Sequence, residues 1–250
     1  MHQALQLLEK MKDISWFGEV CAANGLVLSD EQKSMFEMYR QLLVHWNSQI
    51  NLISRRDEEN FYPNHALNSI SFLFVTRLFH DACVMDLGTG GGLPGIPLKI
   101  ILPQLQLTML DSILKKTMAV QAIVSEMKIA DAVVVTGRAE EIAKKREFEH
   151  KFDYVVSRAA GKLDDVAKWS RGFLVEPGAP SSGTIHGGTL IVLKGGKFNE
   201  ELKHARSLKF IESVEVRDII FDGMDEVENK EKKLVIIEYK SMVQSVGRKN

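Results

Sequence analysis

The chain has few of the features that mark secreted, membrane-spanning or zinc-stabilised proteins. Its 250 residues contain only two cysteines, Cys21 and Cys83, which lie far apart and form no C-x-x-C pair. This spacing argues against a disulfide framework and a structural zinc site, and it fits a reducing compartment. No apolar run approaches the length of a transmembrane helix. The first residues, MHQALQ, lack the basic and apolar regions of a signal peptide, so we expect a cytoplasmic protein.

The chain also lacks an excess of charge of either sign. Its 32 Lys and Arg residues balance 33 Asp and Glu residues, and the formal net charge is −1. This argues against tight, sequence-independent binding of nucleic acid, which needs many cations against phosphate. It still allows a local basic rim around one cleft. A hydrophobic fraction of 45% predicts a folded chain with one large domain, or one domain with a small appendage.

Hydrophobic periodicity divides the chain near residue 80. Apolar residues recur at three- and four-residue spacing between Met35 and Ile53, which predicts one amphipathic helix capped at Ser29 or Asp30. We expect further helices over residues 5–11, 16–23 and 65–79. We therefore expect residues 1–80 to form an N-terminal helical region that packs on a core domain formed by residues 81–250.

After residue 80, short β-rich runs alternate with helical segments. Strands are predicted at 83–87, 106–110, 132–136, 154–157 and 190–194, and helices at 96–101, 112–127, 139–146 and 163–173. This alternation predicts an α/β fold with a mostly parallel sheet and helices on both faces. Two final runs, 214–221 and 233–239, have no helix between them, so we expect an antiparallel hairpin at the sheet edge. Residues 176–188 are rich in Gly, Pro and Ser and predict a mobile loop.

A glycine-rich segment, DLGTGGGLPGIP, begins at Asp86, after the first predicted strand. Glycines at such a turn let the backbone approach a ligand closely. Gly90, Gly92 and Gly95 fit the dinucleotide fingerprint literally, which would make the chain an NAD(P)-dependent oxidoreductase. Asp86, two residues before Gly88, instead makes the segment resemble the D-x-G-x-G loop of class I S-adenosylmethionine-dependent methyltransferases. In such sites the acidic residue faces the cationic amino-acid moiety of the ligand.

Asp111 ends the second predicted strand. A carboxylate at this place can accept hydrogen bonds from both ribose hydroxyls of a nucleoside. It can also cap the helix that begins at Ser112, and the two roles can coexist. Together with the glycine loop, this spacing favours a bound nucleoside over a purely structural turn.

Several blocks, taken in order, resemble the GidB/RsmG family of bacterial 16S ribosomal RNA guanine-N7 methyltransferases. The most specific are residues 86–98 and the Gly-Arg-Ala-Glu-Glu block at 137–141; the others are 46–47 with 51–54, 65–69, 110–112 with 115–116, 157–159 and 193–195. The similarity spans about residues 39–239. Asn68 is a departure, because it stands where the family has Asp; the side chain keeps its acceptor oxygen and loses its charge. The loop 176–188 is also longer than the usual family turn.

This resemblance implies a class I, Rossmann-like methyltransferase fold, a mostly parallel seven-stranded sheet, and S-adenosyl-L-methionine as cofactor, with no metal. It places the cofactor near Asp86, Gly88, Gly90, Gly92, Leu93, Asp111, Ala139, Glu140 and Arg158. Without the resemblance of the block at 137–141, we would interpret Glu140 as a carboxylate that stabilises the first turn of its helix. Arg158 could pair with Asp86 or contact RNA phosphate, and the sequence leaves both open.

Methyl transfer to guanine N7 needs no general base, because the N7 lone pair is free in the neutral base. Catalysis would depend on aligning N7 with the methyl group in a dry site. The sequence contains no convincing Ser/His/Asp or Cys/His set, and His65 is interpreted as structural. Cations at predicted strand ends are candidates for orienting the base: Arg138, Arg158 and Lys194.

Guanine N7 lies on the major-groove edge, which proteins cannot reach in an A-form helix, so we expect an unpaired or splayed target base. The candidates for RNA contact are Arg55, Arg56, Lys115, Lys116, Lys194 and Lys197. Residues 144–146 lie among acidic residues and are interpreted as a solvated face. We expect a monomer that acts on 16S ribosomal RNA or the 30S subunit. A methyltransferase for another substrate stays open as an alternative.

Overall fold

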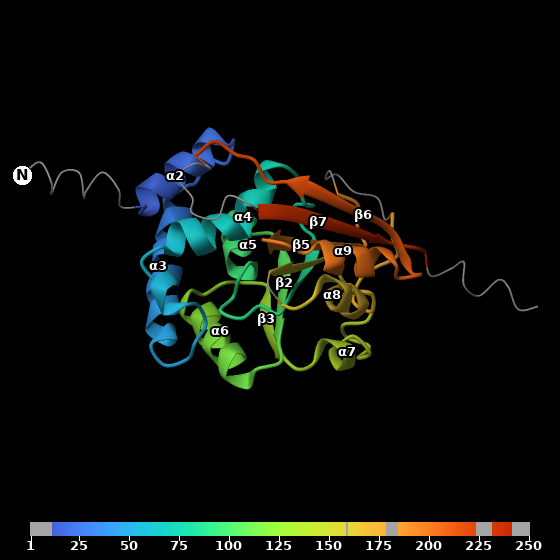
Figure 1. Cartoon of the computed structure of the whole chain (residues 1–250). Coiled ribbons are helices and arrows are strands. Elements are labelled where there is room, and N and C mark those ends of the chain that lie inside the picture. The colour runs from blue at the N-terminus through green and yellow to red at the C-terminus, as the bar shows by residue number, and fades with distance from the viewer. Residues whose placement is uncertain (1–11, 159, 179–184, 224–231, 242–250) are drawn as a thin grey trace, which may run out of the picture.

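The sheet is the centre of the fold in the computed structural model, which describes residues 12–158, 160–178, 185–223 and 232–241 (Figure 1). Its strands are β1 (Cys83–Leu87), β2 (Gln106–Asp111), β3 (Ala132–Thr136), β4 (Tyr154–Arg158), β5 (Thr189–Gly195), β6 (Ile211–Asp218) and β7 (Lys232–Tyr239). They form one seven-stranded sheet in the order β3-β2-β1-β4-β5-β7-β6. Strands β1 to β5 run parallel, and β7 pairs antiparallel with both β5 and β6. The predicted mostly parallel sheet with an antiparallel C-terminal hairpin is confirmed.

Helices cover both faces of this sheet (Figure 1). One face carries α2 (Ile14–Ala23), α3 (Asp30–Asn47), α4 (Asn68–Ile70), α5 (Gly95–Ile101) and α6 (Leu114–Glu126). The other carries α7 (Ala139–Ile142), α8 (Leu163–Ser170) and α9 (Asn199–Arg206). Each face has its own hydrophobic core, and alternate residues of the strands serve the two cores. In β4, for example, Tyr154 and Val156 pack on the α5 side, and Val155 packs on the α8 side.

Helix α3 begins as expected and ends earlier than the periodicity predicts. Ser29 caps it through a capping box with Gln32. The helix ends at Asn47, whose buried Oδ1 accepts hydrogen bonds from the amides of Leu52 and Ile53 at 2.7 and 2.9 Å. This turn sends residues 52 and 53 back into the core, so the apolar spacing continues although the helix does not.

The N-terminal helices and the sheet share one continuous core. Tyr39 of α3 is fully buried, and its hydroxyl donates to the carbonyl of Gly91 at 2.9 Å. Gln32 donates to the carbonyl of Ile100 in α5 at 3.0 Å. The glycine-rich loop is therefore supported from behind by the N-terminal helices.

Several predicted bounds are corrected. Short helical turns, η2 (Tyr62–Leu67), α4 and η3 (Ser71–Phe74), replace the helix expected over 65–79, and α7 is shorter than the helix expected over 139–146. Helix α9 was not predicted, and β6 lies earlier than the expected run 214–221. The helix expected over 5–11 and positions 179–184 of the loop lie outside the described residues. Within the described part of the chain, no helix has the length and apolarity to cross a membrane.

Candidate cofactor and substrate site

A cavity of about 600 Å³ opens at the carboxyl ends of the parallel strands. This is the edge where ligands bind in open α/β sheets. Its walls come from the loops after β1, β2, β3 and β4, from the segment between α3 and α4, and from the start of β7. The lining residues are Leu52, Asp57, Asn64, His65, Asn68, Leu87, Gly88, Thr89, Gly90, Gly91, Leu93, Leu110, Asp111, Ser112, Ile113, Lys116, Gly137, Arg138, Ala139, Glu140, Arg158, Ala160, Trp169 and Lys232.

The loop after β1 uses glycine for two different reasons. At Gly88 the φ angle is +75°, and a Cβ atom would lie only 2.4 Å from the Cβ of Ala160. The strand end can therefore approach the loop after β4 only without a side chain. At Gly90 the φ angle is +58°, and a Cβ atom would meet nothing within 4 Å. That backbone faces the open cavity and is accessible to a ligand.

Asp86 has a different role from the one expected. Its side chain alternates with those of Met85 and Leu87, so it points toward α5 and is fully buried. Its Oδ2 accepts hydrogen bonds from the Thr89 hydroxyl at 2.6 Å and the Gly95 amide at 2.9 Å. Burial raises the pKa of the Asp86 carboxyl to about 6. Asp86 holds the two ends of the glycine loop together and does not line the cavity, which corrects the expectation that it faces the ligand.

Asp111 ties the loops after β1 and β2 together at the cavity wall. Its Oδ2 accepts from the amide of Gly90 at 3.0 Å, and its Oδ1 accepts from the amide of Ile113 at 2.9 Å. The second bond closes the turn before α6, but the helix begins at Leu114 without a side-chain cap, so the expected capping of a helix at Ser112 is not confirmed. A carboxylate offers about four acceptor positions. Two backbone bonds therefore leave Asp111 with capacity for ligand hydroxyls.

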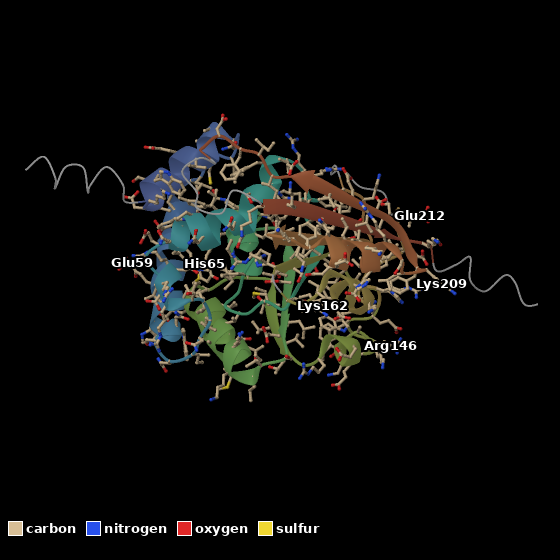
Figure 2. The ribbon with its side chains drawn as sticks, viewed as in Figure 1. Glu59, His65, Arg146, Lys162, Lys209 and Glu212 are labelled. Atoms are coloured by element: carbon tan, nitrogen blue, oxygen red, sulfur yellow. The ribbon has the colours of Figure 1, made fainter. Side chains whose placement is uncertain are left out.

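Arg158 extends from the end of β4 to the segment before α4. Its guanidinium donates to the carbonyl of Asn64 at 3.3 Å and contacts Nδ1 of His65 at 3.2 Å. Because a guanidinium can only donate, Nδ1 of His65 must accept, and the neutral ring carries its proton on Nε2. Burial and the charge of Arg158 lower the pKa of His65 to about 4. His65, labelled in Figure 2 beside the N-terminal helices, is therefore a neutral acceptor that orients Arg158.

Charges are distributed unevenly around the cavity. Asp111 and Glu140 share the side of β2 and β3 with Lys116 and Arg138. Arg158 and Lys232 lie on the side of β4 and β7, where the carboxylate of Asp57 acts on Arg158. Burial lowers the pKa of both cations, and the charge of Arg158 lowers that of Lys232 further. The carboxylates of Asp111 and Glu140 can therefore receive hydroxyl groups, and the pair of cations at Arg158 and Lys232 can receive an anion.

Most of the predicted site residues lie together on this cavity. They are Gly88, Gly90, Leu93, Asp111, Lys116, Arg138, Ala139, Glu140 and Arg158. Six others lie outside its lining in addition to Asp86, namely Gly92, Arg55, Arg56, Lys115, Lys194 and Lys197. Lys194 pairs with Glu201 at 2.6 Å and donates to the carbonyl of Gly161 at 3.0 Å, so its charge is already neutralised. Arg55 and Arg56 are exposed beside Asp57, which does line the cavity.

Several cavity residues lie outside the glycine and strand-end patterns of the sequence and were not predicted. Asp57 and Asn64 come from the segment between α3 and α4, Trp169 comes from α8, and Lys232 comes from β7. Asn64 and Lys232 carry no local signal, since each is an ordinary polar residue in its own segment. Asn68 also lines the cavity, and its amide donates to the carbonyl of Asn64 at 2.8 Å. Replacement of Asp by Asn at position 68 is thus compatible with this turn.

Solved structures with the same arrangement define the class. A predicted O-methyltransferase from Agrobacterium tumefaciens superposes with a TM-score of 0.54 at 16% identity, over 71% of this chain and 82% of that chain. The fibrillarin/Nop5p complex superposes with a TM-score of 0.51 at 14% identity, over 69% and 80%. The strand order is that of the class I methyltransferase fold.

The family follows from the sequence comparisons. Residues 32–232 match the family described as rRNA small subunit methyltransferase G. The proteins of that name from Phocaeicola vulgatus and Porphyromonas gingivalis are 40% and 37% identical, over 72% and 75% of this chain and 83% and 80% of theirs. The chain belongs to the rRNA small subunit methyltransferase G family, GidB/RsmG, and is an S-adenosylmethionine-dependent methyltransferase of small-subunit ribosomal RNA. The family assignment decides against the oxidoreductase alternative.

Proposed function

We propose that the chain binds S-adenosylmethionine in this cavity and directs its methyl group to N7 of a guanine in 16S ribosomal RNA. The observation that carries the proposal is the Asp111 carboxylate. It orders the glycine loop through Gly90 and keeps acceptor capacity toward the open space beside that glycine. A nucleoside fits this arrangement, because its ribose presents two hydroxyl donors.

The remaining contacts follow from the distribution of charge. S-adenosylmethionine supplies an electrophilic methyl group on a sulfonium and carries one carboxylate. Ala139 and Glu140, at the start of α7, would flank the adenine end, and Gly88 and Leu93 would admit the middle of the molecule. Arg158, oriented by His65, would hold the carboxylate.

No residue of the cavity needs to act as a general base. Guanine N7 has a free lone pair, so the chain's task is to align the base and exclude water. Arg138 lies at the cavity wall and is the remaining candidate for orienting the base, since Lys194 is already paired. Arg55 and Arg56, exposed beside the cavity residue Asp57, are the favoured RNA contacts; Lys116, which lines the cavity, and its neighbour Lys115 are further candidates. The solvated interpretation of residues 144–146 fits the position of Arg146, which lies at the periphery in Figure 2.

The decisive experiment is nucleoside mass spectrometry of 16S ribosomal RNA from a strain that lacks this gene. We expect loss of one 7-methylguanosine and its return when the gene is supplied. Glu140→Gln should restore the modification poorly, and Glu141→Gln, a matched change at the next and exposed position of α7, should restore it fully. Unchanged 7-methylguanosine at every position of the deletion strain would exclude the function.

The proposal also concerns the assembly state of the RNA substrate and the oligomeric state of the enzyme. Purified protein, labelled S-adenosylmethionine and either naked 16S ribosomal RNA or 30S subunits would show which is methylated. We propose a cytoplasmic monomer, with residues 1–80 as a helical region on a methyltransferase domain of residues 81–250. Light scattering on the protein as it elutes from a size-exclusion column measures its mass, which is 28.1 kDa for a monomer and twice that for a dimer.

A further inference from the structure

Lys232 is a cation of the cavity that the proposed mechanism does not use. It begins β7 and pairs in register with Gly195 at the carboxyl end of β5, which brings it to the sheet edge where the cavity opens. Leu234, two residues further along β7, packs in the core beneath the N-terminal helices. Because side chains alternate along a strand, Lys232 faces the same side as Leu234, where His65 and Arg158 also lie.

Lys232 is half-buried, and none of the residues that the structure describes neutralises it. Within the described ranges of the chain, its ammonium group forms no hydrogen bond or ion pair, and the charge that acts on it is that of Arg158. Arg158 itself contacts two neutral groups, the Asn64 carbonyl and His65, while the carboxylates of Asp86 and Asp57 act on it without a hydrogen bond. Two cations thus share one end of the cavity at the cost of partial desolvation and mutual repulsion. An anionic ligand would offset both costs.

Two anions come into question, the carboxylate of the cofactor and a phosphate group of the RNA. Arg158, fixed by two contacts at the end of β4, is the residue proposed for the carboxylate. Lys232 lies beyond it, on the strand next to β5. A base drawn out of an RNA structure is held by its backbone as well as its edge, and lysine binds phosphate as a point charge. We propose that Lys232 binds the phosphate group adjacent to the target guanosine and so positions the acceptor base; this inference rests on the proposed function.

The adjacent lysine provides a matched control. Lys233 carries the same charge on the same strand, points to the opposite face, and pairs with Asp218 of β6. The full-length protein and its Lys232→Gln, Lys232→Arg and Lys233→Gln variants are compared in two binding measurements. Calorimetry measures affinity for S-adenosylmethionine. Filter binding measures affinity for 16S ribosomal RNA from the deletion strain, with S-adenosylhomocysteine present, between about 50 and 200 mM KCl.

We expect Lys232→Gln to weaken RNA binding about tenfold and to lower the slope of log affinity against log salt by about 0.7, the value for one phosphate contact on a single strand. Cofactor affinity should stay within twofold, Lys232→Arg should retain most of the RNA affinity, and Lys233→Gln should match the wild type. Weaker cofactor binding with unchanged RNA binding would overturn the proposal and assign Lys232 to the carboxylate. An unchanged salt slope in Lys232→Gln would overturn it as well.

Because both measurements report binding, they are independent of methyl transfer. Failure of the proposed function would appear as unchanged 7-methylguanosine in the deletion strain. Failure of the phosphate contact would appear only in the comparison of Lys232→Gln with Lys233→Gln.

Discussion

Replacing Gly88 with alanine tests the close approach on which the cofactor loop depends. At φ +75° an alanine sits in the left-handed region, which costs an L-residue about 1–2 kcal/mol. Its Cβ would also lie 2.4 Å from the Cβ of Ala160, where ordinary contacts begin near 3.4 Å. Separating the two loops by about 1 Å costs about 1–3 kcal/mol in overpacking. We therefore expect Gly88→Ala to lower the free energy of unfolding by about 2–5 kcal/mol.

The same displacement should weaken the cofactor site, because Gly88 and Ala160 both line the cavity. A misplacement of about 1 Å typically costs about a hundredfold in reaction rate at a preorganised site, and we expect the same displacement to weaken cofactor binding. Calorimetry with S-adenosylhomocysteine, which cannot react further, would measure this loss. Urea unfolding measured in parallel shows whether the variant is still folded.

A second substitution separates the overlap from the backbone strain. In the Gly88→Ala variant, the new Cβ overlaps the Cβ of Ala160, and Ala160→Gly removes that second atom. The double variant should therefore recover about 1–3 kcal/mol of unfolding free energy and much of the cofactor affinity, relative to Gly88→Ala alone. Gly90→Ala is the control, since it has a similar φ of +58° and no neighbour within 4 Å of its Cβ. Ala160→Gly should not restore the stability or the cofactor affinity of the Gly90→Ala variant. Coupling below about 0.5 kcal/mol between positions 88 and 160 would refute the reasoning.

Three further changes test other contacts of the site. Asp111→Ala removes the acceptor for the amides of Gly90 and Ile113, so cofactor affinity in calorimetry should fall at least tenfold while circular dichroism stays unchanged. Asp86→Asn keeps an acceptor for the loop and removes a buried charge, so unfolding stability at pH 7 should fall by less than about 1 kcal/mol; a tenfold loss of cofactor affinity would contradict the structural role. In the folded protein the pKa of His65 is lowered to about 4, whereas in the unfolded chain it is about 6.5. As the pH falls from about 6.5 to 4, the histidine is protonated first in the unfolded chain, so the folded state loses stability. Relative to His65→Gln, the wild type should therefore lose about 3 kcal/mol over this range in urea unfolding, and parallel curves would contradict the assignment.

The fold was largely predictable because its signals are local. All five parallel strands lie within about one residue of their predicted bounds, since buried parallel strands read as short runs of β-branched and aliphatic residues. The cap at Ser29 and the glycine loop are likewise local. Helix ends were less predictable. The buried Asn47 side chain ends α3, although the apolar spacing around it continues to residue 53.

Part of the cavity wall could not be predicted, because its residues depend on which segments become neighbours in the folded chain. The insertion of β7 between β5 and β6 brings Lys232 beside Arg158. The segment before α4 folds over the end of β4, which brings His65 and Asn64 to the same arginine. None of these pairs is close in sequence, so no spacing rule indicates them.

By itself, the sequence determined the alternation of strands and helices, the glycine turn after β1, and the acceptor at the end of β2, because each depends on residues within a few positions of one another. Only the tertiary structure decided which way the acids and cations face. Asp86 is turned into the core by the two-residue alternation of β1 and by the amide of Gly95, whereas Asp111 remains at the cavity wall. A side chain's role at a sheet edge depends on which face it occupies and what packs there, and that is settled only when the strands are assembled.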